Sequence, residues 1–313
     1  MRHAHQENYL KSWCARRTLQ FKKLMKIKTI GIIVKDKSEA VVTTLRMLHD
    51  FLVSKSCKIL LDPNAEGLLS KDIPILDRAT LGKQSDLAIV IGGDGTFLSA
   101  VRALVDYDVP ILGINLGRLG FLADIYPEDM LETMEQILRG DYVEESRFLL
   151  SSHVIRNKKI ISEAAAFNDV VVHIRDVARM IEFETYINGQ YVNYQRADGI
   201  VVSTPTGSTA YALSGGGPLL HATLDAIVLV PICPHTLSNR PLVVNANSEI
   251  DIVIGQNKQS TAQVSFDGQT ACDVLPGDKI RIWRKPNAVK LIHPAQYDYY
   301  EILRAKLRWS EQL

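Results

Sequence analysis

The sequence is poor in several features, and each shortage excludes a class of protein. Only four of its 313 residues are cysteine and none are spaced as CxxC, so a zinc ribbon and a disulfide framework are both excluded and a reducing compartment, the cytoplasm, is expected. No apolar run approaches the ~18–20 residues that cross a membrane. Runs such as 226–230, closed by Pro231, predict buried strands instead. The 36 basic and 35 acidic residues nearly cancel, so neither nucleic acid nor a membrane is an expected partner.

The first 25 residues are basic but contain no apolar segment. They carry six Lys or Arg side chains and a single acid, Glu7. This pattern does not fit a secretory signal. A transit peptide is one interpretation; a simpler one is an upstream start codon that precedes a true start near Met25. We therefore interpret residues 1–25 as a disordered N-terminal extension.

From residue 26 to about residue 145, apolar strands alternate with segments of helical spacing. Alternation of this kind is typical of a parallel sheet that helices cover on both faces. The sequence therefore predicts a Rossmann-like α/β domain over residues 26–145. Its strands are expected at 27–34, 57–61, 87–91 and 110–114, and its helices at 38–54, after residue 96 and at 127–138.

Beyond residue 145, short runs with β-propensity follow one another with few helices between them. Asn188-Gly189 between two such runs is typical of a hairpin turn. We predict an all-β, sandwich-like domain over residues 146–295, followed by a helical segment at 296–313 that packs back on the protein. We expect the two domains to meet at a cleft and to share no sheet. The predicted strands are 151–156, 160–167, 170–174, 180–187, 200–203, 242–244, 249–254, 262–266, 279–284 and 289–292.

The most informative segment is Gly92-Gly93-Asp94-Gly95-Thr96, which directly follows a predicted buried strand and opens a helix. Its glycines let the backbone approach a ligand and adopt positive φ. The helix N-terminus suits phosphate. Asp94 stands at the carboxyl end of a parallel strand, where α/β sheets place ligands. The alternative is that Asp94 or Thr96 only caps the helix.

Two further segments carry polar groups suited to a nucleotide. Residues 203–214 hold many hydroxyls, which can bind sugars, phosphates and a carboxamide, and Tyr211 adds a ring suited to stacking. The alternative is a Ser/Thr-rich surface turn. Asn168-Asp169 interrupts an apolar strand pattern: the amide can read an adenine edge, and the carboxylate can accept both hydroxyls of a ribose. The hydroxyl-bearing residues in the loop are Ser203, Thr204, Thr206, Ser208 and Thr209.

Together these segments resemble the NAD kinase family, whose members make NADP by phosphorylating the adenosine 2′-hydroxyl of NAD with ATP. The resemblance runs from about residue 27 to residue 303 and looks most like the enzymes of Gram-negative bacteria. It implies NAD and ATP as partners, Mg²⁺ carried with the ATP, and a homo-oligomer, either dimer or tetramer. The motifs occur in the family's order and spacing, at 92–96, 113–121, 168–169, 198–211 and 234–241.

The resemblance also implies roles for individual residues. Asp94 would be the base that takes the proton from the 2′-hydroxyl, with phosphate held at Gly92, Gly93, Gly95 and Thr96. Asn168 would face adenine, Asp169 would hold ribose hydroxyls, and Asp198 would bind the nicotinamide end. The remaining implied NAD contacts are Gly95, Phe121, Arg179, Arg196, Thr206, Thr209, Ala210, Tyr211, Ala212, Leu213, Ser214 and Gln269.

Two positions depart from the family pattern. Many members have Glu in place of Asp169, which here shortens the reach but keeps the charge. Close relatives tend to have His where this chain has Arg179.

Two other classes of function share parts of this pattern. A lipid or sugar kinase could use the same glycine-rich element, but the hydroxyl-rich segment at 206–211 and the lack of an apolar or basic membrane patch speak against it. A non-catalytic NAD sensor would tolerate loss of Asp94, which this chain retains. Formation of NADP from NAD and ATP in a coupled assay separates the three.

A variant that begins at Met25 should keep the melting temperature and the activity of the full chain. Residues 1–24 show no core periodicity and precede the first predicted buried strand. Thermal unfolding and NADP formation, measured on both proteins, check this. Loss of either property would give the extension a structural or targeting role.

Overall fold

The computed structural model describes residues 27–117, 120–175, 180–236, 238–256 and 261–309. The expected extension at 1–25 and the implied contact at Arg179 lie outside these ranges. Within them, no helix is both long enough and apolar enough to cross a membrane.

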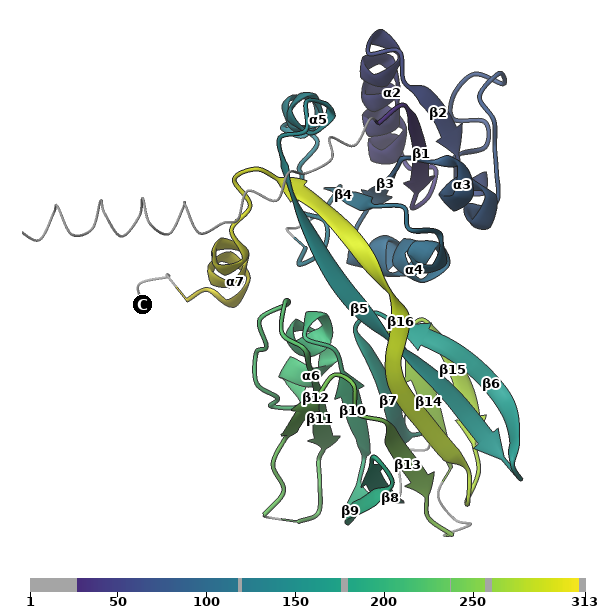
Figure 1. Ribbon diagram of the computed structural model, residues 1–313, viewed down its shortest axis with the longest axis vertical. Helices are drawn as coiled ribbons and strands as arrows, with labels where there is room; N and C mark the ends of the chain where they lie inside the picture. Colours follow the sequence, from purple (N-terminus) through teal and green to yellow (C-terminus); the bar gives the residue numbers. More distant parts are fainter. Residues whose placement is uncertain (1–26, 118–119, 176–179, 237, 257–260, 310–313) are drawn as a thin grey trace, which may run out of the picture.

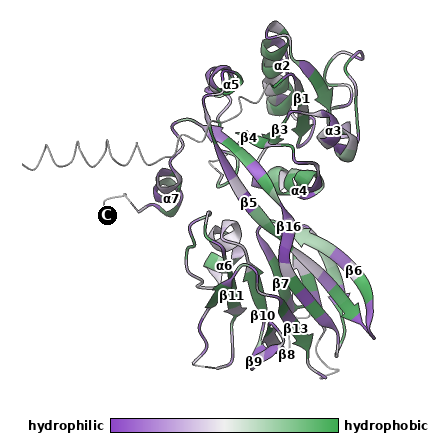
Figure 2. Cartoon of the chain, viewed as in Figure 1, coloured by the Kyte–Doolittle hydropathy of each residue, from purple (hydrophilic) through white to green (hydrophobic). Residues whose placement is uncertain are grey.

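The N-terminal part is a parallel sheet covered on both faces, as the alternating pattern predicts. Its strand order is β2-β1-β3-β4, and every pair of neighbours is parallel. Because β1 and β3 are apolar on both sides, each face must be covered by helices; Figure 2 shows this hydrophobic composition. The strands are β1 (Thr29–Val34), β2 (Lys58–Leu61), β3 (Leu87–Gly92) and β4 (Ile111–Asn115).

Four helices supply this cover, two on each face. Helices α2 and α5 pack on one face of the sheet, and α3 and α4 pack on the other. The buried side chains of α2 lie at helical spacing, at Val41, Leu45, Leu48 and Leu52. They are α2 (Glu39–Ser54), α3 (Arg78–Gln84), α4 (Asp94–Leu104) and α5 (Met130–Leu138), with short 3₁₀ turns η1 (Pro63–Ala65) and η2 (Val105–Tyr107).

The C-terminal part consists of two sheets packed face to face, which confirms the sandwich-like expectation. A six-stranded sheet has the order β12-β11-β10-β7-β14-β15, and its partner consists of β16, β13, β8, β9, β5 and β6. Large side chains such as Phe183 and Phe266, one from each sheet, fill the space between them. The strands are β5 (Tyr142–Arg156), β6 (Lys159–Ala166), β7 (Asp169–Ile174), β8 (Ile181–Ile187), β9 (Gln190–Ala197), β10 (Gly199–Ser203), β11 (Ala226–Ile232), β12 (Leu242–Asn245), β13 (Ile250–Ile254), β14 (Ala262–Phe266), β15 (Thr270–Val274) and β16 (Lys279–Pro294).

Two long strands join the N-terminal sheet to one of the two C-terminal sheets, which together form a ten-stranded sheet (Figure 1). β5 and β16 are 15 and 16 residues long and pair antiparallel from Lys279↔Ile155 to Pro294↔Tyr142. β16 also pairs with β4 at Leu291↔Ile111. The expectation that the domains share no sheet is therefore wrong, and the expected boundary at 145 and 146 falls inside β5.

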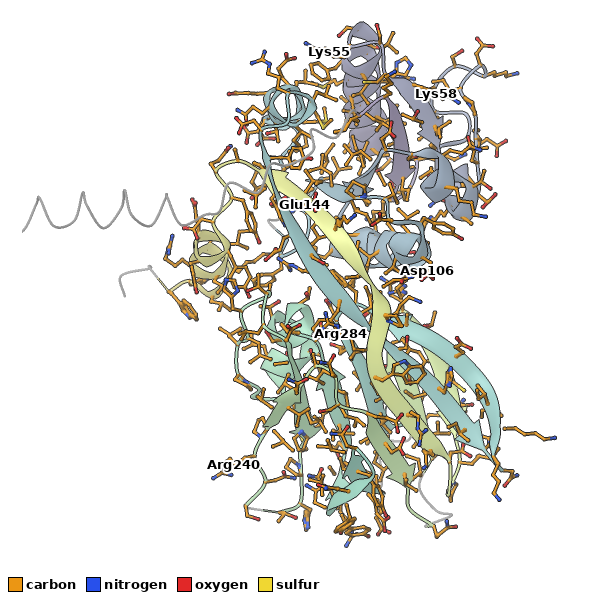
Figure 3. The ribbon with its side chains drawn as sticks, viewed as in Figure 1. Lys55, Lys58, Asp106, Glu144, Arg240 and Arg284 are labelled. Carbon is orange, nitrogen blue, oxygen red and sulfur yellow. The ribbon has the colours of Figure 1, made fainter. Side chains whose placement is uncertain are left out.

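The two runs at 279–284 and 289–292 belong to one strand that is interrupted by a bulge between Arg284 and Ala288. The bulge brings Lys285 and Asn287 into contact with Asp106 in η2. The Lys285 ammonium lies 3.0 Å from that carboxylate, and the Asn287 amide donates to it at 2.8 Å. Figure 3 labels Asp106 just beyond α4 and Arg284 on the long strand. The bulge thus links the β-rich part to the helical layer.

The C-terminal helix α7 (Tyr299–Leu307) packs back on the protein as expected, with Ile302 and Leu303 buried. It contacts both parts of the chain. Lys306 lies over the Phe121 ring, 5.6 Å from its centroid, and the Tyr299 hydroxyl donates to the Leu220 carbonyl at 3.4 Å.

Replacing Leu291 by Ala should lower the free energy of unfolding by about 2–5 kcal/mol, because Leu291 is 1% exposed in the core that α4 shares with β16. Leu275→Ala is a suitable control, since Leu275 is 50% exposed and its loss should change stability by no more than about 0.5 kcal/mol. Denaturant titration measures both. Equal effects would show that the junction of β4 and β16 is not a packed core.

Candidate active site

Asp94 is the first residue of α4, and the backbone of a neighbouring loop holds its carboxylate. The Phe121 N–H donates to Oδ2 at 3.0 Å and the Leu122 N–H donates to Oδ1 at 3.3 Å. Gly120 permits this approach, since a Cβ there would lie 2.1 Å from Asp94 Oδ1. The half-buried carboxylate is therefore fixed at the start of α4, and Phe121 contributes its amide to this arrangement.

The glycines around Asp94 allow close approach rather than unusual backbone angles. The expectation of positive φ is wrong, because none of Gly92, Gly93 and Gly95 adopts it, and Gly93 has a φ of −108°. A Cβ on Gly92 would lie 2.7 Å from Thr96 Oγ1, so this glycine lets the helix pack on its strand. A Cβ on Gly93 would meet no atom within 4 Å. The start of α4 is thus open to a ligand at Gly93.

Asn168 and Asp169 form a tight corner between β6 and β7, and a buried carboxylate holds this corner in place. Asp267, in the turn between β14 and β15, accepts the N–H groups of Phe167, Asn168 and Asp169 at 3.1, 2.7 and 3.3 Å. Its own N–H donates to the Asp169 carbonyl at 3.0 Å. Sequence reasoning missed Asp267, although Asp267-Gly268 has the composition of a hairpin turn beside the implied contact Gln269.

The corner presents one amide and one carboxyl group to a cavity of about 320 Å³. Burial, reinforced by the negative charge of Asp267, raises the pKa of Asp169 to about 7. The buried Asn168 Oδ1 has no hydrogen-bond partner among the residues that the structure describes. Both side chains therefore have hydrogen-bonding capacity for a ligand. His173, Ala210, Tyr211 and Gly268 also line the cavity.

Most hydroxyls of the 203–209 segment bind backbone groups of the protein. The expectation that they bind a ligand is therefore corrected for these residues. Ser203 Oγ and Thr204 Oγ1 donate to the Asn168 carbonyl at 3.1 and 3.2 Å, and Ser208 Oγ donates to the Pro205 carbonyl at 2.7 Å. All three residues are fully buried, and a buried hydroxyl needs a partner. Ser203 and Thr204 therefore hold the backbone of the corner, whereas Ser208 stabilises its own segment.

The rest of this segment divides between the cavity and the core. It forms the 3₁₀ turn η3 (Thr206–Thr209) and the short helix α6 (Tyr211–Ser214), and Thr209 Oγ1 donates to the Thr206 carbonyl at 3.1 Å. Ala210 and the half-exposed Tyr211 line the cavity, whereas Ala212 is buried against Val171 and Val201. Leu213 is half-buried and Ser214 is exposed at the end of α6.

Three side chains connect α4 to the corner across the two parts of the chain. The Arg102 guanidinium of α4 lies 2.5 Å from Asp267 Oδ2 and donates a second hydrogen bond to Gln269 Oε1. Gln269 Nε2 then donates to the Gly95 carbonyl at 2.7 Å. The structure thus brings Asp94, Gly95, Asn168, Asp169 and Gln269 into one region, and Arg102 is a member that the sequence did not indicate.

Asp198 and Arg196 lie at the opposite end of β10. Ser203 pairs with Asp169 and Gly199 pairs with His173, so Asp198 is about five residues from the corner, or roughly 16 Å along the strand at ~3.3 Å per residue. Arg196 is exposed and lies 3.4 Å from Glu182. The sequence-predicted contacts therefore form two groups at opposite ends of the paired strands β7 and β10, a separation that suits a long ligand rather than a compact one.

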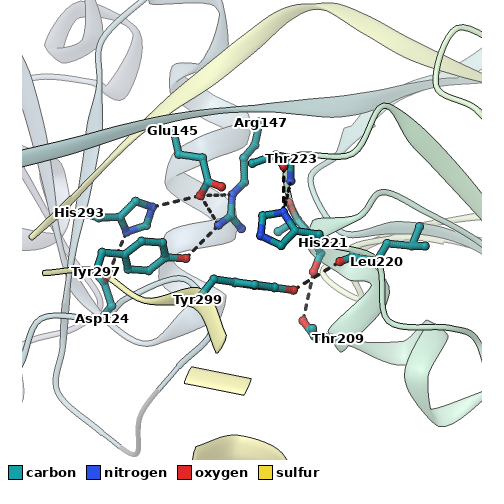
Figure 4. Close-up of polar contacts among 11 residues, drawn as sticks. Asp124, Glu145, Arg147, Thr209, Leu220, His221, Thr223, His293, Tyr297 and Tyr299 are labelled. Atoms are coloured by element: carbon teal, nitrogen blue, oxygen red, sulfur yellow. Dashed lines mark hydrogen bonds and ion pairs between the residues drawn. The ribbon is translucent and has the colours of Figure 1, made fainter. Parts of the chain in front are cut away.

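A buried charged network fixes the loop that follows Leu122 (Figure 4). Arg147 on β5 donates to Glu145 Oε2 at 3.0 Å through Nε, and His293 Nδ1 on β16 lies 2.8 Å from Asp124 Oδ2. Burial opposes ionisation of Glu145, but its ion pair with His293 at 3.5 Å and the charge of Arg147 outweigh burial and lower the pKa of Glu145 to about 2. Asp124 is thereby held two residues beyond the Leu122 amide that binds Asp94. No sequence motif indicated this network.

The sequence matches two family models: the ATP-NAD kinase N-terminal domain over residues 30–142 and the ATP-NAD kinase C-terminal domain over residues 167–294. The NAD kinase of Nitrosococcus oceani is 50% identical over 287 residues, covering 91% of this chain and 98% of that protein. The NAD kinase of Pseudomonas putida (strain GB-1) is 49% identical, covering 91% and 97%.

Two solved structures resemble this one. Yeast NADH kinase complexed with NADH matches with a TM-score of 0.82 and 25% identity, covering 92% of this chain and 89% of that chain. An NAD kinase from Archaeoglobus fulgidus in complex with ATP has the same fold, with a TM-score of 0.70 and 24% identity, covering 90% and 98%. The resemblance to NAD kinases of Gram-negative bacteria is confirmed. The chain belongs to the NAD kinase family, whose reaction is the ATP-dependent phosphorylation of NAD.

Proposed function

We propose that NAD binds along β7 and β10 with its adenosine between the Asn168–Asp169 corner and Asp94. The observation that carries this proposal is the pair of contacts from Arg102 to Asp267 and from Gln269 to Gly95, which hold the start of α4 against the corner. In this pose Asn168 faces adenine and Asp169 accepts ribose hydroxyls. Asp198, about five residues from the corner along β10, and Arg196 on the preceding strand β9 receive the nicotinamide end.

Asp94 acts as the general base in this proposal. It takes the proton of the adenosine 2′-hydroxyl while the 2′-oxygen forms its bond to the γ-phosphorus of ATP. The bond from that phosphorus to the β,γ-bridging oxygen breaks, and ADP leaves with the electron pair. Two backbone amides hold the Asp94 carboxylate, so its position is set before substrate arrives.

The phosphates of ATP bind at the start of α4, at Gly92, Gly93, Gly95 and Thr96. An open Gly93 and a helix N-terminus together suit an anion. Mg²⁺ arrives with the ATP as part of the substrate and neutralises its charge. In the part of the chain that the structure describes, no three His, Cys, Asp or Glu side chains are grouped to hold a metal ion.

We also propose that the chain assembles as a homo-oligomer, a dimer or a tetramer, in the cytoplasm. The edge strands β9 and β12 expose Tyr191, Tyr194, Leu242 and Val243, which a second copy of the chain would cover. The cytoplasmic assignment rests on cysteine usage, since the described Cys57, Cys233 and Cys272 are all free thiols.

Asp94→Asn should lower turnover by about 10²–10⁴, because the amide keeps the shape of the side chain but cannot accept the proton. NAD affinity should change little, since most of the proposed contacts lie elsewhere. Single-turnover rates and equilibrium titration with NAD measure the two quantities. Asp50→Asn is the control, because Asp50 is exposed on α2 and should be replaceable without effect.

A rate for Asp94→Asn within about threefold of the wild type would exclude Asp94 as the base, since general-base catalysis requires a loss of at least ~10². Recovery of the rate with added Mg²⁺ would assign Asp94 to metal binding instead.

NAD affinity should fall as the pH falls through about 7, the pKa of Asp169. Only ionised Asp169 accepts two ribose hydroxyls, so below this pH the apparent affinity follows the ionised fraction and drops by nearly tenfold per pH unit. Calorimetric titration with NAD between pH 5.5 and 8.5 measures the profile. His173 lines the same cavity, so Asp169→Asn is the matched variant. The NAD affinity of this variant should be weaker than that of the wild type and nearly independent of pH. A variant that keeps the pH profile of the wild type would contradict the role of Asp169.

A further inference from the structure

Asp267 touches both parts of the proposed site, although neither the family resemblance nor the reaction assigns it a role. We propose that Asp267 is a positioning residue that fixes the Asn168–Asp169 corner against the helix that begins at Asp94. The inference rests on the proposed roles of Asp94 and Asp169. It adds a residue that controls how those two groups are placed relative to each other.

The hydrogen bonds of Asp267 leave it no capacity for substrate. Oδ1 accepts from the Asn168 and Asp169 amides, and Oδ2 accepts from the Phe167 amide and from Arg102 Nη1. Its side chain is fully buried. Three successive backbone N–H groups that converge on one anion form the arrangement that elsewhere binds phosphate, and here the protein supplies the anion itself. Asp267 therefore holds in place the backbone that carries Asn168 and Asp169.

The turn that carries Asp267 is built to deliver this carboxylate. Asp267 has a φ of 52° and Gly268 a φ of 63°, so the chain turns through the left-handed region at both residues. Asp tolerates that region better than most residues. Asn would be accommodated in the turn, but its NH₂ group cannot accept from a backbone amide or from Arg102. A carboxylate with two acceptor oxygens is therefore what the site requires.

The same residue links the corner to the catalytic helix. Arg102 is 17% exposed at its side chain and joins Asp267 to Gln269, which in turn binds the carbonyl of Gly95. Asp94 and Asn168 are thus connected through side-chain contacts across the two parts of the chain. A displacement of about 1 Å between reacting groups can lower a rate by about 10².

Asp267 also acts on the titration of Asp169, which gives a readout specific to this role. Burial and the Asp267 charge raise the pKa of Asp169, while Arg102 faces Asp267 from α4 and His173 and Tyr211 line the cavity from β7 and α6. Removing the Asp267 charge should lower the pKa of Asp169. The pH at which NAD affinity falls should then move below its wild-type value.

The test is Asp267→Asn in the full chain, with Asp278→Asn as the matched control. Asp278 is also a buried carboxylate that binds an arginine and a backbone amide: Arg156 Nη2 lies at 2.7 Å and the Leu275 N–H at 2.8 Å. It lies at the far end of β5 and β16 from the Asn168–Asp169 corner. Asp267→Asn should lower turnover by about 10² and shift the midpoint of the NAD-affinity profile to lower pH. Asp278→Asn should lower only the melting temperature.

If Asp267→Asn does not fold, the variant Arg102→Gln tests the same proposal. This variant leaves the Asp267 charge in place but removes the link to α4, so turnover should fall while the midpoint does not move to lower pH. Wild-type turnover in Arg102→Gln would overturn the inference. So would a folded Asp267→Asn with wild-type turnover and midpoint, or with no effect beyond the loss of stability that the control shows. A wild-type chain that makes no NADP would instead contradict the proposed function.

Discussion

The pairing of β5 with β16 is the constraint on which the rest of the structure depends. Both strands run through the two parts of the chain, and one residue pair, Leu291↔Ile111, continues the sheet into β4. A hinged linker would let the parts rotate, whereas a shared hydrogen-bonded sheet fixes their relative position. The charged network of Arg147, Glu145 and His293 lies on these same strands and holds the loop that binds Asp94. The rigid pair thereby sets the geometry of the site.

Three carboxylates in the site have different surroundings, and these surroundings separate their roles. Backbone amides hold Asp94 on one side, and its position at the start of α4 suits a base. Asp267 is saturated by three amides and Arg102, which suits a structural anion. Asp169 is buried beside that anion, and its raised pKa marks it as the group that gains most from new hydrogen-bond donors. In the proposed mechanism the carboxylate group therefore serves as a base at Asp94, as a structural anion at Asp267 and as a ligand-binding group at Asp169.

The sequence predicted the features that local patterns encode. The parallel sheet, the Asn188-Gly189 hairpin and the position of Asp94 followed from periodicity and turn chemistry. The length of β5 did not, because Glu145 and Arg147 look like surface residues until β16 pairs with them, and Pro286 conceals the continuity of β16. Ser203, Thr204 and Ser208 belong to a hydroxyl-rich segment that suggests ligand binding, but a sequence does not show which of its hydroxyls face inward. Asp267 was missed because its partners are backbone amides about 100 residues away.

A crystal structure of the chain with NAD bound is the most direct measurement of the central claim, which is that the dinucleotide bridges the two parts with its adenosine 2′-hydroxyl at Asp94. The account predicts a 2′-oxygen about 2.6–3.2 Å from an Asp94 carboxylate oxygen, with adenine at Asn168. It would be contradicted by NAD bound entirely on the β-rich part, with that oxygen beyond hydrogen-bond reach of Asp94 and the start of α4 making no contact with the ligand.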